Sequence, residues 1–307
     1  RAVWLFIGAC FLLLFLVPEM VNSCDNTSRR STNSAVARVI STPQPTATAP
    51  QATPTPTPTP RATPPVVMAQ PVPVAPPALG GRVLTVGLGG HAPHRTITSA
   101  IQAARSGDVV RVQPGIYREQ LTLKSGVALS GTDRDNCIIE WTGSGPALSF
   151  SSGAIATVEN LTFDGRGRGT DEGVLVEQSH VAIRNCVIQN FGQSGIWVTG
   201  SVANAMLNGN TLRANGFSAI SFSGGASGTA ARNTCENNAR AGIVVVNPGT
   251  RVTLRGNRGS RNGLYGIYID NSEVWDPLWR RWKQAEATLE MNTVRGMVGE
   301  FFGSGNP

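Results

Sequence analysis

The sequence is poor in charged and in aromatic residues. Charged residues make up 15% of the 307 residues, and aromatic residues only 6%, whereas charged residues make up about 25% of an average domain. This composition excludes a coiled coil or long-helix protein, which would be rich in Glu, Lys, Leu and Ala. Because 40% of the residues are hydrophobic, it also argues against a chain kept disordered by charge. An all-β or loop-rich chain remains, for which 35 glycines are typical.

Proline is scarce outside one stretch. Thirteen of the 20 prolines lie in residues 43–77, which include four consecutive Thr-Pro pairs over residues 53–60. No packed core can form there, so we predict a disordered, polyproline-like linker over residues 25–79. The alternation of Thr with Pro also suits O-glycosylation, and an unmodified linker fits the same composition.

The sequence has one long apolar run, ahead of this linker. Residues 2–17 are apolar and follow Arg1; the run is slightly short for a membrane span but suits a signal-peptide core. Residues 21–24 resemble a bacterial lipoprotein box, in which Cys24 would be lipidated. We expect residues 1–24 to be a leader, with lipidation, plain secretion and an uncleaved anchor as alternatives. Each places the rest of the chain outside a bacterial-type cytoplasm, with membrane contact only through this leader or its lipid.

From residue 80 onward the dominant feature is a repeat of about 24 residues. An apolar residue precedes each Asn-centred turn at Ile183, Leu207, Ala230, Leu254 and Leu289. Isoleucine opens the next strand at Ile196, Ile220, Ile243 and Ile267. Asparagine recurs at Asn210, Asn233, Asn257 and Asn292. Three classes of position with one period indicate a solenoid.

Within each unit, apolar residues alternate with period 2 over four or five residues, which indicates strands. A unit with two or three short strands cannot bury its own face, but stacked units can. We therefore predict an all-β fold over residues 80–307, a parallel β-helix with one chain turn per coil. The recurring Asn is expected to adopt left-handed backbone angles and to hydrogen-bond between coils.

A short amphipathic helix is predicted over residues 96–104, ahead of the first coil. Ile97, Ile101 and Ala104 share one face of it, and Thr96 or Thr98 can cap its N-terminus. Such a helix would cover the open end of the first coil, as the ends of solenoids require.

The opening of this domain carries a recognisable series of residues. It runs from Thr96-Ile97 through Gly107-Asp108-Val109-Val110 to Pro114-Gly115-Ile116-Tyr117-Arg118-Glu119. This series resembles the opening of the pectate-lyase-like superfamily, and the later coils resemble its repeats over roughly residues 82–300. The resemblance implies a right-handed β-helix and an association with polysaccharides. It is much weaker for activity, because one fold carries many chemistries.

Three cysteines lie outside the leader: Cys137, Cys186 and Cys235. They are 49 residues apart each time, which is two coils. Two coils separate Cα atoms by about 9–10 Å, which exceeds the limit of about 7 Å for a disulfide. We predict three buried thiols that act as small apolar residues, in preference to a metal cluster.

Motifs of known catalytic sites are missing. Gly115 to Glu119 is similar to the first motif of pectin methylesterases, but their later motifs are absent, as are those of polygalacturonases and pectate lyases. The only histidines, His91, His94 and His180, have no triad or metal-ligand spacing. We therefore predict no metal centre and no cofactor, with calcium as the one candidate ion.

Carboxylates are the remaining catalytic candidates, because glycoside hydrolysis needs two of them and lyase chemistry needs a base. The loop over residues 164–172 carries Asp164, Asp171 and Glu172 beside two arginines. It could bind a sugar acid or calcium, or it could be a solvated surface loop. Asp270 follows a strand four coils later, beside an insertion.

This insertion makes one coil about 11 residues longer than the others. It holds three tryptophans and a pair of arginines: Trp275, Trp279, Trp282, Arg280 and Arg281. Asp276 as N-cap and Pro277 at the first helical position predict a helix with the tryptophans on one face. The helix would be either an aromatic, cationic platform for sugars or a lid packed on the solenoid.

The net charge of +7 rests on arginine, since Lys124 and Lys283 are the only lysines. Arg255 and Arg258 lie in one arginine-rich coil and could belong to a positive stripe along the solenoid, or to a solvated face. With an export signal, a polyanionic glycan fits such a stripe better than nucleic acid does.

Three functions are consistent with these features. The leading hypothesis is an exported, surface-anchored β-helix that binds acidic polysaccharide without a recognisable catalytic site, through the insertion, Arg255 and Arg258. The first alternative is a carbohydrate-active enzyme (lyase, hydrolase or uronate epimerase) that uses the carboxylates of residues 164–172 or Asp270. The second alternative is a purely structural surface solenoid.

Overall fold

The structure is a computed structural model that describes residues 80–90, 92–169, 171–270, 274–276, 281–283, 286–294 and 297–301. The predicted leader over residues 1–24 and the predicted linker over residues 25–79 lie outside these residues, as do Trp279 and Arg280. None of the helices in the described part of the chain is long and apolar enough to cross a membrane.

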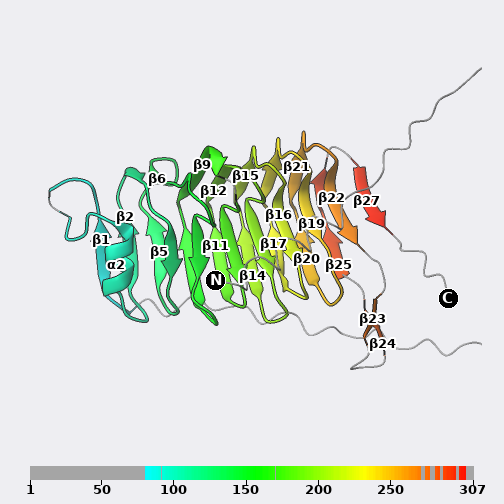
Figure 1. The fold of residues 1–307 in the computed structure, drawn as a ribbon, viewed down its shortest axis with the longest axis horizontal. Helices are drawn as coiled ribbons and strands as arrows, with labels where there is room; N and C mark the ends of the chain where they lie inside the picture. The colour runs from blue at the N-terminus through cyan, green and yellow to red at the C-terminus, as the bar shows by residue number, and fades with distance from the viewer. Residues whose placement is uncertain are drawn as a thin grey trace, which may run out of the picture. The chain divides into compact units, whose positions relative to one another are not determined.

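Three parallel sheets run side by side along the solenoid (Figure 1). Sheet A contains β1 (Val83–Val86), β2 (Val109–Val112), β5 (Ala128–Gly131), β8 (Ile155–Glu159), β11 (His180–Arg184), β14 (Asn204–Asn208), β17 (Ser227–Ala231), β20 (Arg251–Arg255) and β25 (Glu286–Glu290). Sheet B contains β3 (Gly115–Tyr117), β6 (Cys137–Glu140), β9 (Thr162–Gly169), β12 (Val187–Phe191), β15 (Thr211–Arg213), β18 (Thr234–Glu236), β21 (Arg258–Ser260) and β26 (Thr293–Val294). Sheet C contains β4 (Leu121–Leu123), β7 (Leu148–Phe150), β10 (Val174–Glu177), β13 (Ile196–Thr199), β16 (Ser218–Ser223), β19 (Ala241–Val245), β22 (Tyr265–Asp270) and β27 (Met297–Phe301).

Each coil of the chain contributes one strand to each sheet, in the order A, B, C. The order is repeated eight times between β2 and β27, and β1 adds a ninth strand to sheet A. The predicted stack of isoleucines is present in sheet C, where Ile196, Ile220, Ile243 and Ile267 are Cα partners from coil to coil. The all-β parallel β-helix predicted from the repeat is therefore confirmed.

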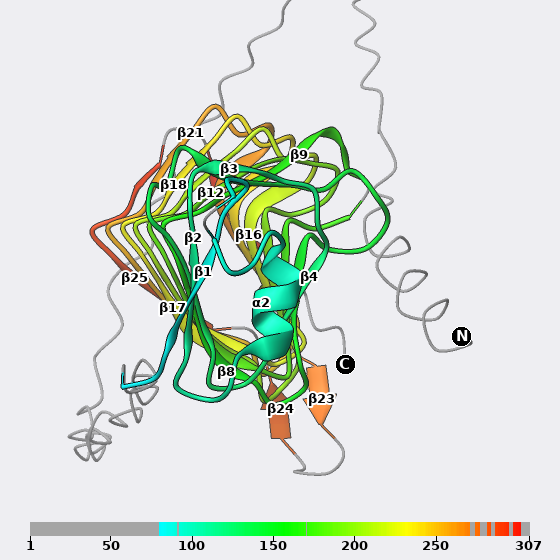
Figure 2. The ribbon, with the colours of Figure 1, turned by 90° about the vertical axis from the view of Figure 1, so that its left-hand side faces the viewer.

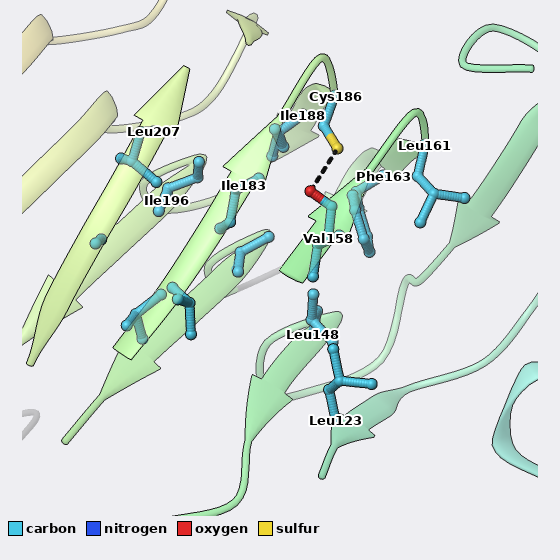
Figure 3. Packing of buried hydrophobic residues seen from close by; sticks show 14 of the residues in the cluster. Leu123, Leu148, Val158, Leu161, Phe163, Ile183, Cys186, Ile188, Ile196 and Leu207 are labelled. Atoms are coloured by element: carbon cyan, nitrogen blue, oxygen red, sulfur yellow. Dashed lines mark hydrogen bonds between the residues drawn. The ribbon is translucent and has the colours of Figure 1, made fainter. Parts of the chain in front are cut away.

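The core is a continuous apolar column inside the three sheets. Its largest fully buried side chains include Phe163 and Phe222, together with leucines and isoleucines of every sheet. Figure 3 shows part of this column, in which Leu148 of sheet C points toward Val158 of sheet A and Ile196 of sheet C points toward Ile183 of sheet A. The strands are too short to bury apolar area alone, so stacking against the neighbouring coils supplies the core.

The recurring asparagines form a ladder in the turn between sheets A and B. Asn210 Nδ2 donates to Asn233 Oδ1, Asn233 Nδ2 to Asn257 Oδ1, and Asn257 Nδ2 to Asn292 Oδ1, at 2.9–3.0 Å. The ladder begins where the Cys186 backbone N–H donates to Asn210 Oδ1. The predicted hydrogen bonding between coils is confirmed.

A second ladder, which the repeat analysis missed, lies five residues further on, in the turn between sheets B and C. Asn215 Nδ2 donates to Asn238 Oδ1, and Asn238 Nδ2 donates to Asn262 Oδ1, both at 3.0 Å. The Phe191 backbone N–H donates to Asn215 Oδ1 at the start of this ladder. The two ladders therefore brace both ends of the short strands of sheet B.

The prediction that the ladder asparagines themselves adopt left-handed angles is wrong. The residue just before each of them has the positive φ. These residues are Gly209, Arg232, Gly256 and Met291 in the first ladder and Ala214, Asn237 and Arg261 in the second. The sharp turn is thus made one residue early, and the Asn side chain is left to point inward and bond to the next coil.

The predicted capping helix is present as α2 (Ile97–Ala103) and lies across the mouth of the first coil in Figure 2. The Thr96 hydroxyl accepts from the Ser99 N–H, which identifies Thr96 as the N-cap. Glu119 also binds this terminus, since its two carboxylate oxygens accept from the backbone N–H groups of Ile97 and Thr98 at 2.8 and 2.9 Å. A carboxylate at a helix N-terminus satisfies unpaired donors and meets the positive end of the helix dipole.

All three predicted thiols are free and buried. Cys137 and Cys186 lie in their coils at the position, just before or at the start of the sheet B strand, that Asn210 takes in the next coil. Cys235 lies two residues further along its own coil, as the Cα partner of Leu212. Burial raises the pKa of Cys186 and of Cys235 to about 12. Cys186 and Cys235 therefore stay protonated, and all three buried cysteines act as small apolar side chains.

The described residues of the insertion form two short antiparallel strands, not the predicted helix. β23 (Val274–Asp276) pairs antiparallel with β24 (Arg281–Lys283), and Trp275 is the Cα partner of Trp282. An Asp-Pro pair opens β-turns as readily as helices, and Val and Trp favour strands. The placement of three tryptophans on one helical face is therefore wrong.

Candidate functional site

A groove follows the corner at which the chain passes from sheet B to sheet C; we call it the corner groove. It consists of two adjoining hollows of about 640 and 410 Å³, which share Gly167 and Asn190. The larger hollow is lined by residues of coils one to four: Arg118, Glu140, Trp141, Thr142, Arg166, Gly167 and Asn190. The smaller hollow continues over coils four to six.

A row of polar residues borders this groove at the C-terminal end of the sheet B strands. Each is the Cα partner of the next, one coil apart: Glu140, Asp164, Gln189, Arg213, Glu236 and Ser260. Strand spacing places successive members about 4.8 Å apart. The register therefore brings carboxylates, amides and guanidinium groups from distant parts of the sequence into one line.

Glu140 holds two arginines at the mouth of the larger hollow. Its carboxylate is 10% exposed and lies 3.0 Å from Arg118 Nε and 3.4 Å from Arg166 Nε. The two arginine side chains remain 73% and 61% exposed. Two guanidinium groups thus share one carboxylate, and both face solvent at the mouth of the groove.

Asp164, one of the predicted catalytic candidates, is buried beneath the groove and fully hydrogen-bonded. Its carboxylate accepts from Gln189 Nε2 and Asn190 Nδ2, both at 2.9 Å, and from the Arg166 backbone N–H at 2.7 Å. Gln189 in turn accepts from Arg213 Nε at 2.8 Å. The carboxylate oxygens of Asp164 are thus occupied by protein donors, and they fix the loop that carries Arg166.

Trp141 forms one wall of the larger hollow. Its indole Nε1 donates to the Gly145 carbonyl at 3.0 Å, which closes a tight loop over residues 141–145. The Gly145 N–H donates to Asp171 Oδ2, so this predicted candidate ties the Trp141 loop to the next coil. Asp171 therefore shapes the wall of the groove.

Among the predicted catalytic candidates, Glu172 has a pKa that is raised toward neutral pH. The side chain is half-buried, and burial, assisted by the charge of neighbouring Asp171, raises the pKa of Glu172 to about 7. A carboxyl with such a pKa is about half protonated at neutral pH, so it can serve as a general acid.

The other predicted site residues lie away from the corner groove. Asp270 ends β22 in coil seven, four coils beyond Glu172. Arg255 forms an ion pair with Glu290 at 3.4 Å on sheet A, and Arg258 begins β21. Trp275, Trp282 and Arg281 belong to the β23–β24 hairpin. The structure thus places Asp164 beneath the groove and Asp171 on its wall, and it does not join either to the insertion or to the arginines of coil seven.

Sequence reasoning missed Arg118, Glu140 and Trp141. A usable signal existed, because Glu140, Asp164 and Gln189 are spaced by 24 and 25 residues, which is one coil each. No group of three or more His, Cys, Asp or Glu residues in the described part of the chain could hold a metal ion.

These features define the class of protein: a parallel β-helix with a polar groove along one corner. The family model described as the right handed beta helix region matches residues 125–297, more than half of the chain, and the chain belongs to this family. The right hand implied by the sequence resemblance is thereby confirmed. No curated protein sequence matches the chain significantly.

Several solved structures are similar in fold. One is the catalytic unit of a thermostable GH87 α-1,3-glucanase from Streptomyces thermodiastaticus strain HF3-3, at 20% identity over 64% of this chain and 42% of that chain, with a TM-score of 0.44. A pectin methylesterase in complex with a hexasaccharide matches at 13% identity over 71% and 80%, with a TM-score of 0.48. The pectin methylesterase of Erwinia chrysanthemi matches at 12% identity over 70% and 90%, with a TM-score of 0.43. The chain spans less than half of the first of these structures.

Proposed function

We propose that the protein binds acidic polysaccharide in the corner groove, as an exported protein held at the cell surface by its N-terminal leader or by a lipid on Cys24. The observation that carries the proposal is the pair of exposed guanidinium groups, Arg118 and Arg166, held on one buried carboxylate. Arginine suits this role because its planar fork matches the geometry of a carboxylate or sulfate.

Trp141 supports a sugar as the ligand. It lines the same hollow as the two arginines, and its indole N–H already donates to the Gly145 carbonyl. An aromatic wall beside cationic groups offers both of the contacts that an acidic sugar needs, since a ring can lie along the indole while its acid group meets a guanidinium. The groove is also open along the solenoid, which favours a chain over a small enclosed metabolite.

The experiment is calorimetric titration of the protein with an oligogalacturonate and with a neutral glucan oligomer of equal length. We expect binding of the acidic oligomer only, weakened as salt is raised because the guanidinium groups are exposed. The double variant Arg118→Ala/Arg166→Ala should lose at least about tenfold in affinity, or about 1.4 kcal/mol. Arg111→Ala, which removes an exposed arginine of sheet A, is the matched control. Equal loss in both variants would mean that net charge, and not the groove, attracts the glycan.

A carbohydrate-active enzyme is the second candidate, favoured by the raised pKa of Glu172. Glu172, with its pKa raised to about 7, would supply the acid that cleavage of a glycan requires. Release of reducing ends or unsaturated products from acidic polysaccharide, abolished by Glu172→Gln, would establish it. Absence of both binding and product release would leave the structural solenoid as the remaining function.

A further inference from the structure

One row of side chains runs along the outer face of sheet A, and part of it is buried. Its members are Cα partners from coil to coil, alternate along each strand with residues of the apolar column, and do not belong to that column. We call it the outer row: Val83, Val109, Ala128, Thr157, Ala182, Met206, Thr229, Thr253 and Thr288. Four consecutive members, in coils one to four, are only 0–8% exposed although they point away from the core: Val109, Ala128, Thr157 and Ala182.

The adjoining coils do not explain this burial. Thr229 and Thr253 are half-buried, whereas Thr157 in the same row is only 5% exposed. The two neighbours of Thr157 in the row are alanines, which are smaller than the Met206 and Thr253 that flank Thr229. Smaller neighbours leave a side chain more exposed, so a further segment of protein lies over the outer row in coils one to four.

The covered strip is narrow. Beside it, Ile155 and His180 are exposed on one side, and Glu159 and Arg184 are half-buried on the other. A second copy or a globular partner packed on the sheet would bury these flanking rows as well, whereas one extended chain covers a single row. The structure contains one chain, so the cover belongs to the same chain.

The helix and strands that the structure describes do not supply this cover. Helix α2 crosses the mouth of the first coil, and β23 and β24 lie beyond coil seven, at the opposite end of the solenoid from coils one to four (Figures 1 and 2). The cover therefore comes from a part of the chain outside the described residues.

The segment that directly precedes Gly80 has the composition and the position for this role. Residues 66–79 contain no charged residue, and they include four valines and four prolines. They end three residues before Val83, the first member of the outer row. A proline-rich chain advances about 3.1 Å per residue and neighbouring strands lie about 4.8 Å apart, so about seven residues are enough to reach from β1 to β11.

The chemistry of the strip also fits this segment. The row from coil one to coil four consists of Val, Ala, Thr and Ala, which an apolar chain can cover without burying a charge. Proline has no N–H, so such a chain offers few donors. Thr157 Oγ1 is accordingly buried without a hydrogen-bond partner.

We propose that residues 66–79 pack as an extended strap on the outer row of sheet A, over Val109 to Ala182. The free linker then ends near residue 65, and it leaves the solenoid from the side of sheet A near coil four, not from the first coil. This inference concerns the face of sheet A and does not depend on what the corner groove binds.

The test is the rate at which a bulky thiol reagent modifies the full chain carrying Thr157→Cys or, as the matched control, Thr229→Cys. Both are the same substitution in the same row, and peptide mapping separates the new thiol from the natural cysteines. In native buffer the Thr157→Cys thiol should react at least about tenfold more slowly, because it reacts only when the strap opens. Equal rates would overturn the cover.

Charges placed in the strap identify the segment. Val72→Asp/Val74→Asp should raise the rate at Thr157→Cys to that of Thr229→Cys, because aspartate is costly to bury on an apolar strip. Thr57→Asp/Thr59→Asp, in the preceding Thr-Pro stretch, adds the same charge and should leave the rate unchanged. Circular dichroism confirms that each variant is folded. A slow rate that Val72→Asp/Val74→Asp does not change would overturn residues 66–79 as the cover.

A cross-linking experiment gives an independent measurement without the cysteine variants. A photoreactive benzoylphenylalanine in place of Val74 should form adducts within one chain, on β5, β8 or β11. Adducts on sheet B or C, adducts between two chains, or no adduct on the solenoid would each overturn the strap.

Discussion

Removal of Asn233 tests whether the asparagine ladder stabilises the solenoid. Asn233 is fully buried and makes four hydrogen bonds through its side chain. Its Oδ1 accepts from the backbone N–H and from Nδ2 of Asn210, and its Nδ2 donates to the Leu207 carbonyl and to Asn257 Oδ1, all at 3.0 Å. Asn233→Ala deletes all four bonds and leaves the Asn210 backbone N–H buried without this partner.

The expected loss follows from these contacts. A buried hydrogen bond contributes about 1 kcal/mol net, and an orphaned buried group costs about 1–3 kcal/mol. Four bonds therefore give a loss of about 4 kcal/mol in the free energy of unfolding. Asn204→Ala is the control, because half-buried Asn204 has one side-chain bond, from its Nδ2 to Ser227 Oγ at 2.9 Å, and should lose about 1 kcal/mol.

Urea unfolding followed by circular dichroism measures both losses through the midpoint and the slope. A solenoid is stabilised coil by coil, so a defect in coil six can also broaden the transition or split it in two. Equal losses for Asn233→Ala and Asn204→Ala, with an unchanged slope, would refute the view that the ladder is a major source of stability. Asn233→Asp gives a second test, in which the direction of the effect is predicted. Burial raises the pKa of the new carboxyl in the folded state, so the free energy of unfolding of this variant should fall as pH rises.

Three further predictions follow from other parts of the structure. The three core thiols should resist a thiol reagent in native buffer at pH 8 and all react in urea, because burial raises the pKa of two of them to about 12; reaction of any thiol before unfolding would contradict the burial. Burial raises the pKa of Glu172 from 4.5 to about 7, so its contribution to stability is present below about pH 4.5 and is lost as pH rises through 7. Glu172→Gln should therefore make the urea midpoint of unfolding less dependent on pH between 4.5 and 7. Glu119→Ala should cost about 1–2 kcal/mol through loss of the helix cap, and amide exchange at Ile97 and Thr98 should accelerate first, whereas Glu119→Gln should recover part of the loss.

The fold was predictable because its signals are local and periodic. The isoleucine stack in sheet C, the capping helix with Thr96 and the burial of the cysteines all follow from spacing along the sequence. The helix predicted for the insertion was wrong because the pair Asp276-Pro277 is typical of a turn as well as of a helix start. The antiparallel pairing of Trp275 with Trp282 joins two separate segments. The periodicity of either segment alone does not distinguish this pairing from a helix.

The groove was only partly predictable, because it depends on register. The loop of residues 164–172 was identified from its charges, but Asp164 turned out to be a support for Arg166 and Asn190. Arg118 and Glu140 come from coils of unequal length, so a fixed period of 24 does not align them. Their meeting depends on the parallel pairing of β3 with β6 and of β6 with β9.

The second ladder connects the stability of the fold to the shape of the groove. Inside the corner, a Cβ on Gly195 would lie 2.8 Å from the Ala219 carbonyl oxygen and 2.9 Å from Asn215 Nδ2. One on Gly242 would lie 2.4 Å from the Gly266 carbonyl oxygen and 3.1 Å from Asn262 Nδ2, so the backbone of the next coil, with the ladder amide beside it, excludes larger residues at the start of these sheet C strands. Outside the corner, the same close stacking keeps Gly216 without a side chain. The buried amides that hold the coils together thus lie where the small residues of the corner groove stack most closely. Asn215 both belongs to the ladder and lines the groove, so its replacement should weaken binding of an acidic oligosaccharide even in variants that remain folded.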